Sequence, residues 1–157
     1  MVPSSAEDGV VTSDASQWVV FACGEHWFGL PLEISREILT PRPMTRLPGC
    51  GPAVCGLVGI RGRVHTVFDF GIILGSRSAL AAPDYRLLVL VVADRRVAVV
   101  VDEIIAVSRE PAQILPLADA LPGTGNADRA DFVGTGVFGD RSFLALDPER
   151  ILGRLLT

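Results

Sequence analysis

The sequence contains no lysine: its 14 basic residues are all arginines, and they stand against 18 acidic residues. The formal net charge is −4 at pH 7. Nonspecific binding to nucleic acids depends on clustered cations that displace counterions from phosphates. A mildly acidic chain without lysine is therefore a poor candidate for a nucleic-acid-binding protein.

Long hydrophobic runs are also missing, because the longest unbroken apolar stretch covers only residues 87–93. A membrane-spanning helix needs about 20 such residues, so we expect no direct membrane insertion. Residues 1–35 contain no basic residue, and a secretory signal or transit peptide would begin with one or more. These features predict a cytoplasmic protein. The three cysteines, Cys23, Cys50 and Cys55, are an odd number, which favours free thiols over a disulfide framework.

Motifs that carry chemistry are incomplete in this chain. The glycine spacing of Gly51–Gly56 matches a phosphate-binding loop, but Leu57 and Val58 stand where lysine and Ser/Thr are required. No four-ligand zinc pattern and no G-x-S-x-G nucleophile elbow are present. Asp102 and Glu103 are neighbours at a strand end, where adjacent side chains point to opposite faces. We therefore expect no enzyme activity, no metal and no cofactor.

The chain is long enough for one domain and is rich in strand signals. Residues 1–15 predict a flexible acidic tail, and from residue 16 onward short Val-, Ile- and Phe-rich runs alternate with Gly, Pro and Asp. Four hairpins are predicted, with loops at Gly24-Glu25, residues 61–63, residues 94–96 and Gly139-Asp140. A leading glycine suits a type II′ turn at the first and last of these loops.

An internal repeat predicts the architecture. Residues 20–38 lie over residues 89–107 at an offset of 69, and residues 56–69 lie over residues 134–147 at an offset of 78. Each half then supplies about five short strands, which favours an all-β fold of two small barrels around a shared hydrophobic core. We place the first barrel at about 17–75 and the second at about 84–148.

Three further expectations follow from local patterns. The Val-rich runs near residues 87–92 and 97–101 lack alternation, so both faces of that strand pair should be covered. The Pro-rich segment 41–52 predicts an ordered connector over one end of the first barrel. Asp147 and Pro148 predict the start of a short C-terminal helix over 148–156.

Exposed arginines are the remaining candidates for function. Arg61 lies at the tip of the hairpin I-R-G-R-V and should project into solvent. It is either an idle solvated charge or part of a protein interface, where arginine is favoured. The segment S-R-E-I at 35–38 leaves the same two alternatives: a solvated turn or the polar rim of a docking groove.

The strings FACGEHWFGLPLEISREIL, GLVGIRGRVHTVFDF, VAVVVDEIIAVS and FVGTGVFGDRSFLALDPERIL resemble the CheW family of chemotaxis coupling proteins over residues 17–156. The resemblance implies two SH3-like five-stranded barrels with short helices. It also implies a non-catalytic adaptor that couples the cytoplasmic hairpin tips of chemoreceptors to the regulatory domain of the histidine kinase CheA, in arrays recruited to the membrane.

The resemblance implies two sets of site residues. Glu37 and Arg61 match the receptor-contacting positions, with the neighbours Ser35, Arg36 and Gly62 included in that site. The segment 112–121 corresponds to the region of kinase or ring contact, which places Ile114, Leu115, Leu117 and Leu121 there.

The chain departs from the family pattern at three positions. Gly59 stands in place of a common Asn, Thr66 in place of a common Pro, and Ser35 in place of a common Val. These changes leave open an adaptor of a non-flagellar chemosensory pathway, for twitching motility or development. A small ligand-binding β-barrel is the alternative from another functional class.

Overall fold

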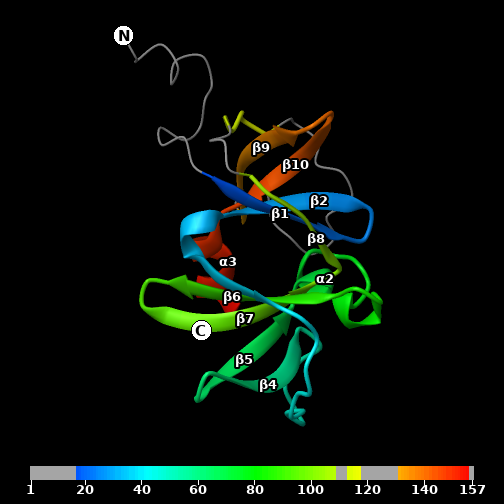
Figure 1. Ribbon diagram of the computed structural model, residues 1–157, viewed down its shortest axis with the longest axis vertical. Coiled ribbons are helices and arrows are strands. Elements are labelled where there is room, and N and C mark those ends of the chain that lie inside the picture. Colours follow the sequence, from blue (N-terminus) through cyan, green and yellow to red (C-terminus); the bar gives the residue numbers. More distant parts are fainter. Residues whose placement is uncertain (1–16, 109–112, 118–130, 156–157) are drawn as a thin grey trace.

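The structure is a computed structural model that describes residues 17–108, 113–117 and 131–155. The predicted tail at 1–15 lies outside these residues. Two five-stranded sheets form the body of the described part, and Figure 1 shows one sheet above the other. The strands are β1 (Trp18–Cys23), β2 (His26–Pro31), β3 (Ser35–Leu39), β4 (Val54–Ile60), β5 (Arg63–Asp69), β6 (Arg86–Val92), β7 (Arg95–Val101), β8 (Glu103–Val107), β9 (Phe132–Phe138) and β10 (Arg141–Leu146).

Short helices connect and cover the sheets. They are the 3₁₀ turns η1 (Leu32–Ile34) and η2 (Ala79–Ala81) and the α-helices α2 (Phe70–Ile73) and α3 (Pro148–Leu155). The predicted all-β class, with two five-stranded units and a C-terminal helix, is confirmed.

The strand order corrects the predicted division of the chain. One sheet has the order β8-β1-β2-β10-β9 and the other β3-β6-β7-β5-β4. Each sheet therefore combines the first hairpin of one half with the last three strands of the other half, and the sheets do not follow consecutive barrels at 17–75 and 84–148. The exchange occurs where η1 leads the chain from β2 into β3, which pairs with β6. A local sequence pattern predicts a strand but does not select its partner.

The internal repeat itself is visible in the topology. At the offset of 69, β1, β2 and β3 correspond to β6, β7 and β8, and at 78, β4 and β5 correspond to β9 and β10. Substituting each strand by its counterpart converts one sheet order into the other. The two intertwined halves thus build two sheets of identical topology.

All four predicted hairpins form. Gly24 and Gly139 have φ of 64° and 66°, as the first position of a type II′ turn requires. The other two loops are one residue shorter than predicted. They contain residues 61–62 and 93–94, because Ile60 pairs with Arg63 and Val92 pairs with Arg95.

Three hydrophobic clusters hold the sheets together. The largest lies between the sheets and contains residues of both, together with residues from α2 and α3. Successive residues of β6 and β7 alternate between this shared cluster and a second one inside the sheet that contains β3–β7. Both faces of this central pair are therefore covered, as the missing alternation predicts. A third cluster, which includes Trp18 and Phe143, lies inside the sheet that contains β1 and β10.

Equivalent aspartates end the last strand of each half. The carboxylate of Asp69 accepts hydrogen bonds from Ser78 Oγ at 2.5 Å, from the N–H of Ala79 at 2.9 Å and from the N–H of Ile72 at 3.3 Å. Its counterpart Asp147 caps the first turn of α3. The carboxylate of Asp69 thus fixes α2 and η2 against the end of β5.

The Pro-rich connector is tied to the sheet by its own bridge. The backbone groups of Thr45 and Leu57 exchange two hydrogen bonds of 2.8 Å. A Cβ atom at Gly56 would lie 2.3 Å from the carbonyl oxygen of Thr45, so only glycine fits. The repeat holds here too, since Gly134 approaches the carbonyl oxygen of Leu115 in the same way.

A buried carboxylate links β8 to the first hairpin. Asp102 accepts a hydrogen bond of 2.9 Å from the N–H of Gly24, and its second oxygen has no hydrogen-bond partner among the described residues. Burial raises the pKa of this carboxyl group above its ordinary value, and the hydrogen bond from Gly24 opposes that shift.

Candidate functional site

Strand β3 carries the first part of the predicted receptor site. Its pairing with β6 contains a bulge, because Ser35 lies opposite Leu90 and Glu37 opposite Val89, which leaves Arg36 as the extra residue. The hydroxyl of Ser35 donates to the carbonyl oxygen of Pro31 at 3.1 Å, so it serves the local turn. Arg36 is exposed, and Glu37 is half-buried.

The β4–β5 turn carries the second part. Arg61 and Gly62 have φ of 51° and 79°, which makes this a type I′ turn with positive φ at both central positions. Glycine adopts that conformation freely, whereas an arginine in it is strained. Strained residues concentrate at functional sites, so the retention of Arg61 at this tip points to a role outside the turn.

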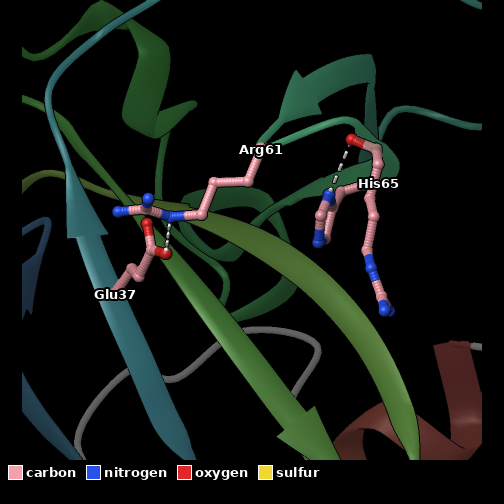
Figure 2. Close-up of polar contacts among 4 residues, drawn as sticks. Glu37, Arg61 and His65 are labelled. Atoms are coloured by element: carbon pink, nitrogen blue, oxygen red, sulfur yellow. Dashed lines mark hydrogen bonds and ion pairs between the residues drawn. The ribbon is translucent and has the colours of Figure 1, made fainter.

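Glu37 and Arg61 meet across the sheet. The Nε of Arg61 donates to Oε2 of Glu37 at 2.5 Å, and Figure 2 shows the guanidinium of Arg61 reaching over β3. The two side chains come from opposite edges of the sheet, since β3 and β4 are its outer strands. Leu39 and Ile60, from the same two strands, pack in one cluster. The outer strands β3 and β4 are therefore not joined by backbone hydrogen bonds, but side chains from the two strands and from the β4–β5 turn contact each other.

The pair remains accessible to a partner. The side chain of Arg61 is 77% exposed, and that of Glu37 is 25% exposed. An ion pair this open contributes only about 0.2–1 kcal/mol to stability. Of the predicted receptor residues, the structure thus joins Glu37 and Arg61, keeps Gly62 as the turn residue, and leaves Ser35 and Arg36 without contact to this pair among the described interactions.

His65 lies on β5 close to this turn (Figure 2). Its Nδ1 is 3.3 Å from the carbonyl oxygen of Arg63, and its Nε2 is buried without a partner among the described residues. Within the described ranges, no group of three or more His, Cys, Asp and Glu side chains could hold a metal ion.

A groove between the two sheets was missed by the sequence reasoning. It has a volume of about 370 Å³ and is lined by Ile38 of β3, Glu103 and Ile104 of β8, and by Asp84 and Arg86. Ile38 is 41% exposed, as is its repeat counterpart Val107 at 42%. The repeat aligns Ile38 with Val107, but no sequence signal shows how the two sheets meet to form this groove.

The structure separates the residues of the predicted kinase contact. Ile114 is fully buried in the third cluster, so it is a core residue, and its assignment to a contact surface is wrong. Leu117 is half-buried against the shared core. Leu115 is 47% exposed and bridges Thr135 at the edge of β9. Leu121 lies outside the described residues.

Leu115 has exposed apolar neighbours that the sequence did not single out. Val137, two residues after the bridge partner Thr135 on β9, is 60% exposed, and Phe138 at the end of the strand is 37% exposed. We call Leu115, Val137 and Phe138 the β9 patch. Exposed apolar side chains gathered along one strand are candidates for an interaction site.

The cysteines differ in environment and are all free. Cys23 is buried, and desolvation raises the pKa of its thiol. Desolvation also raises the pKa of Cys55 to about 12, whereas Cys50 is exposed. The thiols of Cys23 and Cys55 are therefore protonated at neutral pH and unreactive.

Comparisons with known proteins agree with this geometry. Residues 17–155 match the family model described as CheW-like domain. The chain is 31% identical to Protein FrzA of Myxococcus xanthus over 114 residues, which cover 73% of this chain and 68% of that protein. It is 28% identical to the Chemotaxis protein CheW of Rhizobium meliloti (strain 1021) over 109 residues, or 68% of this chain and 70% of that one.

A solved structure shares the fold. The scaffolding protein TtCheW from Thermoanaerobacter tengcongensis superposes with a TM-score of 0.68 at 19% identity, covering 84% of this chain and 88% of that one. Among the described residues, no helix has both the length and the apolar character needed to cross a membrane.

Proposed function

The chain belongs to the CheW-like domain family, and on that premise we propose that it couples a chemoreceptor to a histidine kinase of the CheA type in a chemosensory array. In this role it is a non-catalytic adaptor that acts in the cytoplasm, at receptors held in the membrane. The observation that carries the proposal is the strained, 77% exposed Arg61, paired with Glu37.

The receptor surface combines charge with the apolar stem of an arginine. Arg61 and Glu37 offer a guanidinium and a carboxylate for polar groups of the receptor hairpin. Arginine is favoured at such interfaces because its planar fork binds carboxylates and its stem covers apolar area. Binding energy at an interface is concentrated in few residues, so a single charge reversal should be measurable.

The test is calorimetric titration of the protein with the cytoplasmic hairpin of its cognate receptor. We expect Arg61→Glu to weaken binding at least tenfold. Arg95→Glu provides the matched control, since Arg95 is also exposed and also adjoins a type I′ hairpin turn. Circular dichroism should show that both variants keep the fold. Unchanged affinity of Arg61→Glu would refute the receptor surface.

For the kinase we propose a separate surface, the β9 patch. Leu115 comes from the predicted contact segment, and Val137 extends the same exposed edge. Leu115→Glu should abolish binding of the kinase regulatory domain in a pull-down while leaving receptor binding intact. Val107→Glu, at an exposed apolar residue of another strand, is the control. Equal loss in both variants would reject the patch.

A second candidate function is supported by the match to FrzA. In that case the same two surfaces serve an adaptor of a non-flagellar pathway, for twitching motility or development. Deletion of the gene in the native cell separates the two, since loss of swimming chemotaxis supports the first candidate and loss of surface motility or development supports the second.

A further inference from the structure

A large cavity in the described part is lined by none of the residues assigned to the two proposed surfaces. It has a volume of about 930 Å³ and opens between the Pro-rich segment 41–52 and the region where β5, α2 and η2 meet. Its lining combines two arginines, Arg42 and Arg46, with the hydroxyl-bearing Ser78 and Tyr85 and with apolar side chains such as Met44 and Leu47.

The two arginines of this cavity are unpaired. Within the described ranges the one ion pair joins Arg61 to Glu37, so neither Arg42 nor Arg46 has a carboxylate partner there. The Nε of Arg42 is moreover buried without a hydrogen-bond partner among the described residues. Buried donors are nearly always satisfied, and one that is not points to a ligand, an ion or water.

The acidic group in the lining is not accessible to a ligand. Asp69 is 2% exposed, and its carboxylate already accepts three hydrogen bonds from Ser78, Ala79 and Ile72. Cys55 contributes no negative charge either, because its thiol has a pKa of about 12. The accessible charge of the cavity is therefore positive.

We propose that this cavity binds a carboxylate group carried on an apolar body, with Arg42 and Arg46 as its ligands. The guanidinium fork of an arginine binds a carboxylate in two parallel hydrogen bonds. Met44, Leu47 and Leu80 then contact the apolar part, as in pockets where few polar groups orient a mainly apolar ligand. The carboxylate is supplied either by an acidic side chain of a partner protein or by a small carboxylic acid.

Titration of the ¹⁵N-labelled protein followed by NMR tests the charge requirement, with hexanoate and its uncharged analogue hexanamide as probes. We expect hexanoate to give saturable shifts of the amides of residues 42–55 and hexanamide to bind at least tenfold more weakly. Equal binding of the two probes, or the absence of saturable binding by hexanoate, would overturn the proposal.

Variants test the assigned residues. Arg42→Gln and Arg46→Gln should each weaken hexanoate binding at least tenfold, while the exposed Arg95→Gln should leave it unchanged. Because Arg46 is exposed, its replacement is not expected to disturb folding even if that of the half-buried Arg42 does. A loss of the same size in Arg95→Gln would show nonspecific attraction and refute the site.

The two sources of the carboxylate are separated by a peptide, acetyl-Leu-Glu-Leu-amide. Tighter binding of this peptide than of hexanoate assigns the site to a partner's side chain, and the reverse order assigns it to a small acid. Either order keeps the carboxylate site. If acetyl-Leu-Gln-Leu-amide bound as tightly as acetyl-Leu-Glu-Leu-amide, the result would contradict the carboxylate site. Neither Arg61 nor Leu115 takes part, so these outcomes are independent of the adaptor proposal.

Discussion

Replacement of Arg61 by asparagine separates the contribution of this residue to stability from its contribution to binding. Arg61 holds the first central position of a type I′ turn with φ of 51°. Asparagine is among the residues preferred there, because its short polar side chain tolerates the left-handed conformation. The variant therefore relieves strain and at the same time deletes the ion pair with Glu37.

The two effects have opposite signs and known sizes. A left-handed conformation costs an ordinary residue about 1–2 kcal/mol, of which asparagine recovers a part, roughly 1 kcal/mol. The lost ion pair is mostly exposed and contributes about 0.5 kcal/mol. Arg61→Asn should therefore be more stable than the wild type by about 0.5 kcal/mol, a rise in Tm of about 1–2 °C for a domain of this size.

Urea unfolding followed by tryptophan fluorescence measures this difference, since Trp18 is buried and Trp27 is half-buried. Glu37→Gln is the matched variant, because it deletes the same ion pair but keeps the strained turn. Its free energy of unfolding should be lower than that of the wild type by about 0.5 kcal/mol. If Arg61→Asn were instead less stable than the wild type by more than about 1 kcal/mol, the ion pair would be a structural element, and the inference from strain to function would fail.

Other predictions concern the fold. Gly134→Ala places a Cβ 2.1 Å from a backbone carbonyl oxygen and should lower the free energy of unfolding by about 1–3 kcal/mol, whereas Gly59→Ala, with open space around it, should cost less than about 1 kcal/mol in the same urea titration. Asp69→Ala leaves donors of α2 and η2 without an acceptor and should lower the free energy of unfolding by about 3 kcal/mol, against about 1 kcal/mol for Asp147→Ala at the half-buried cap of α3. Because the folded-state pKa of Asp102 is raised, the native state binds more protons than the unfolded state between that pKa and the ordinary value near 4. The wild type should thus gain stability relative to Asp102→Asn as pH falls through this window. If the difference in the free energy of unfolding between the two proteins stayed constant from pH 7 to pH 4, the raised pKa of Asp102 would be contradicted.

Much of the fold follows from local pattern. Turn residues and apolar runs locate the four hairpins, and the repeat at offsets of 69 and 78 predicts equivalent halves, which the strand correspondence confirms. The exchange of strands between the halves could not be predicted in this way. Whether β3 pairs with its own hairpin or with β6 is decided by the shared core, which buries Leu88 and Leu90 together with Val19 and Phe21.

The site was less accessible to sequence reasoning. Glu37 and Arg61 are 24 residues apart and come from opposite sheet edges, so their placement in one site came from family resemblance, and their ion pair is seen only in the structure. Ile114 and Leu115 are adjacent apolar residues of one segment, and only the structure shows that the first is fully buried and the second exposed. The groove at Ile38 depends on how the two sheets meet, which no local pattern records.

In the proposed function, two separate surfaces of one adaptor hold two proteins together. Sedimentation of the protein with its cognate receptor hairpin and the kinase regulatory domain tests this claim directly. We predict a ternary complex in the wild type, loss of the receptor alone in Arg61→Glu, and loss of the kinase alone in Leu115→Glu. Displacement of one partner by the other, or loss of both partners in either variant, would contradict it.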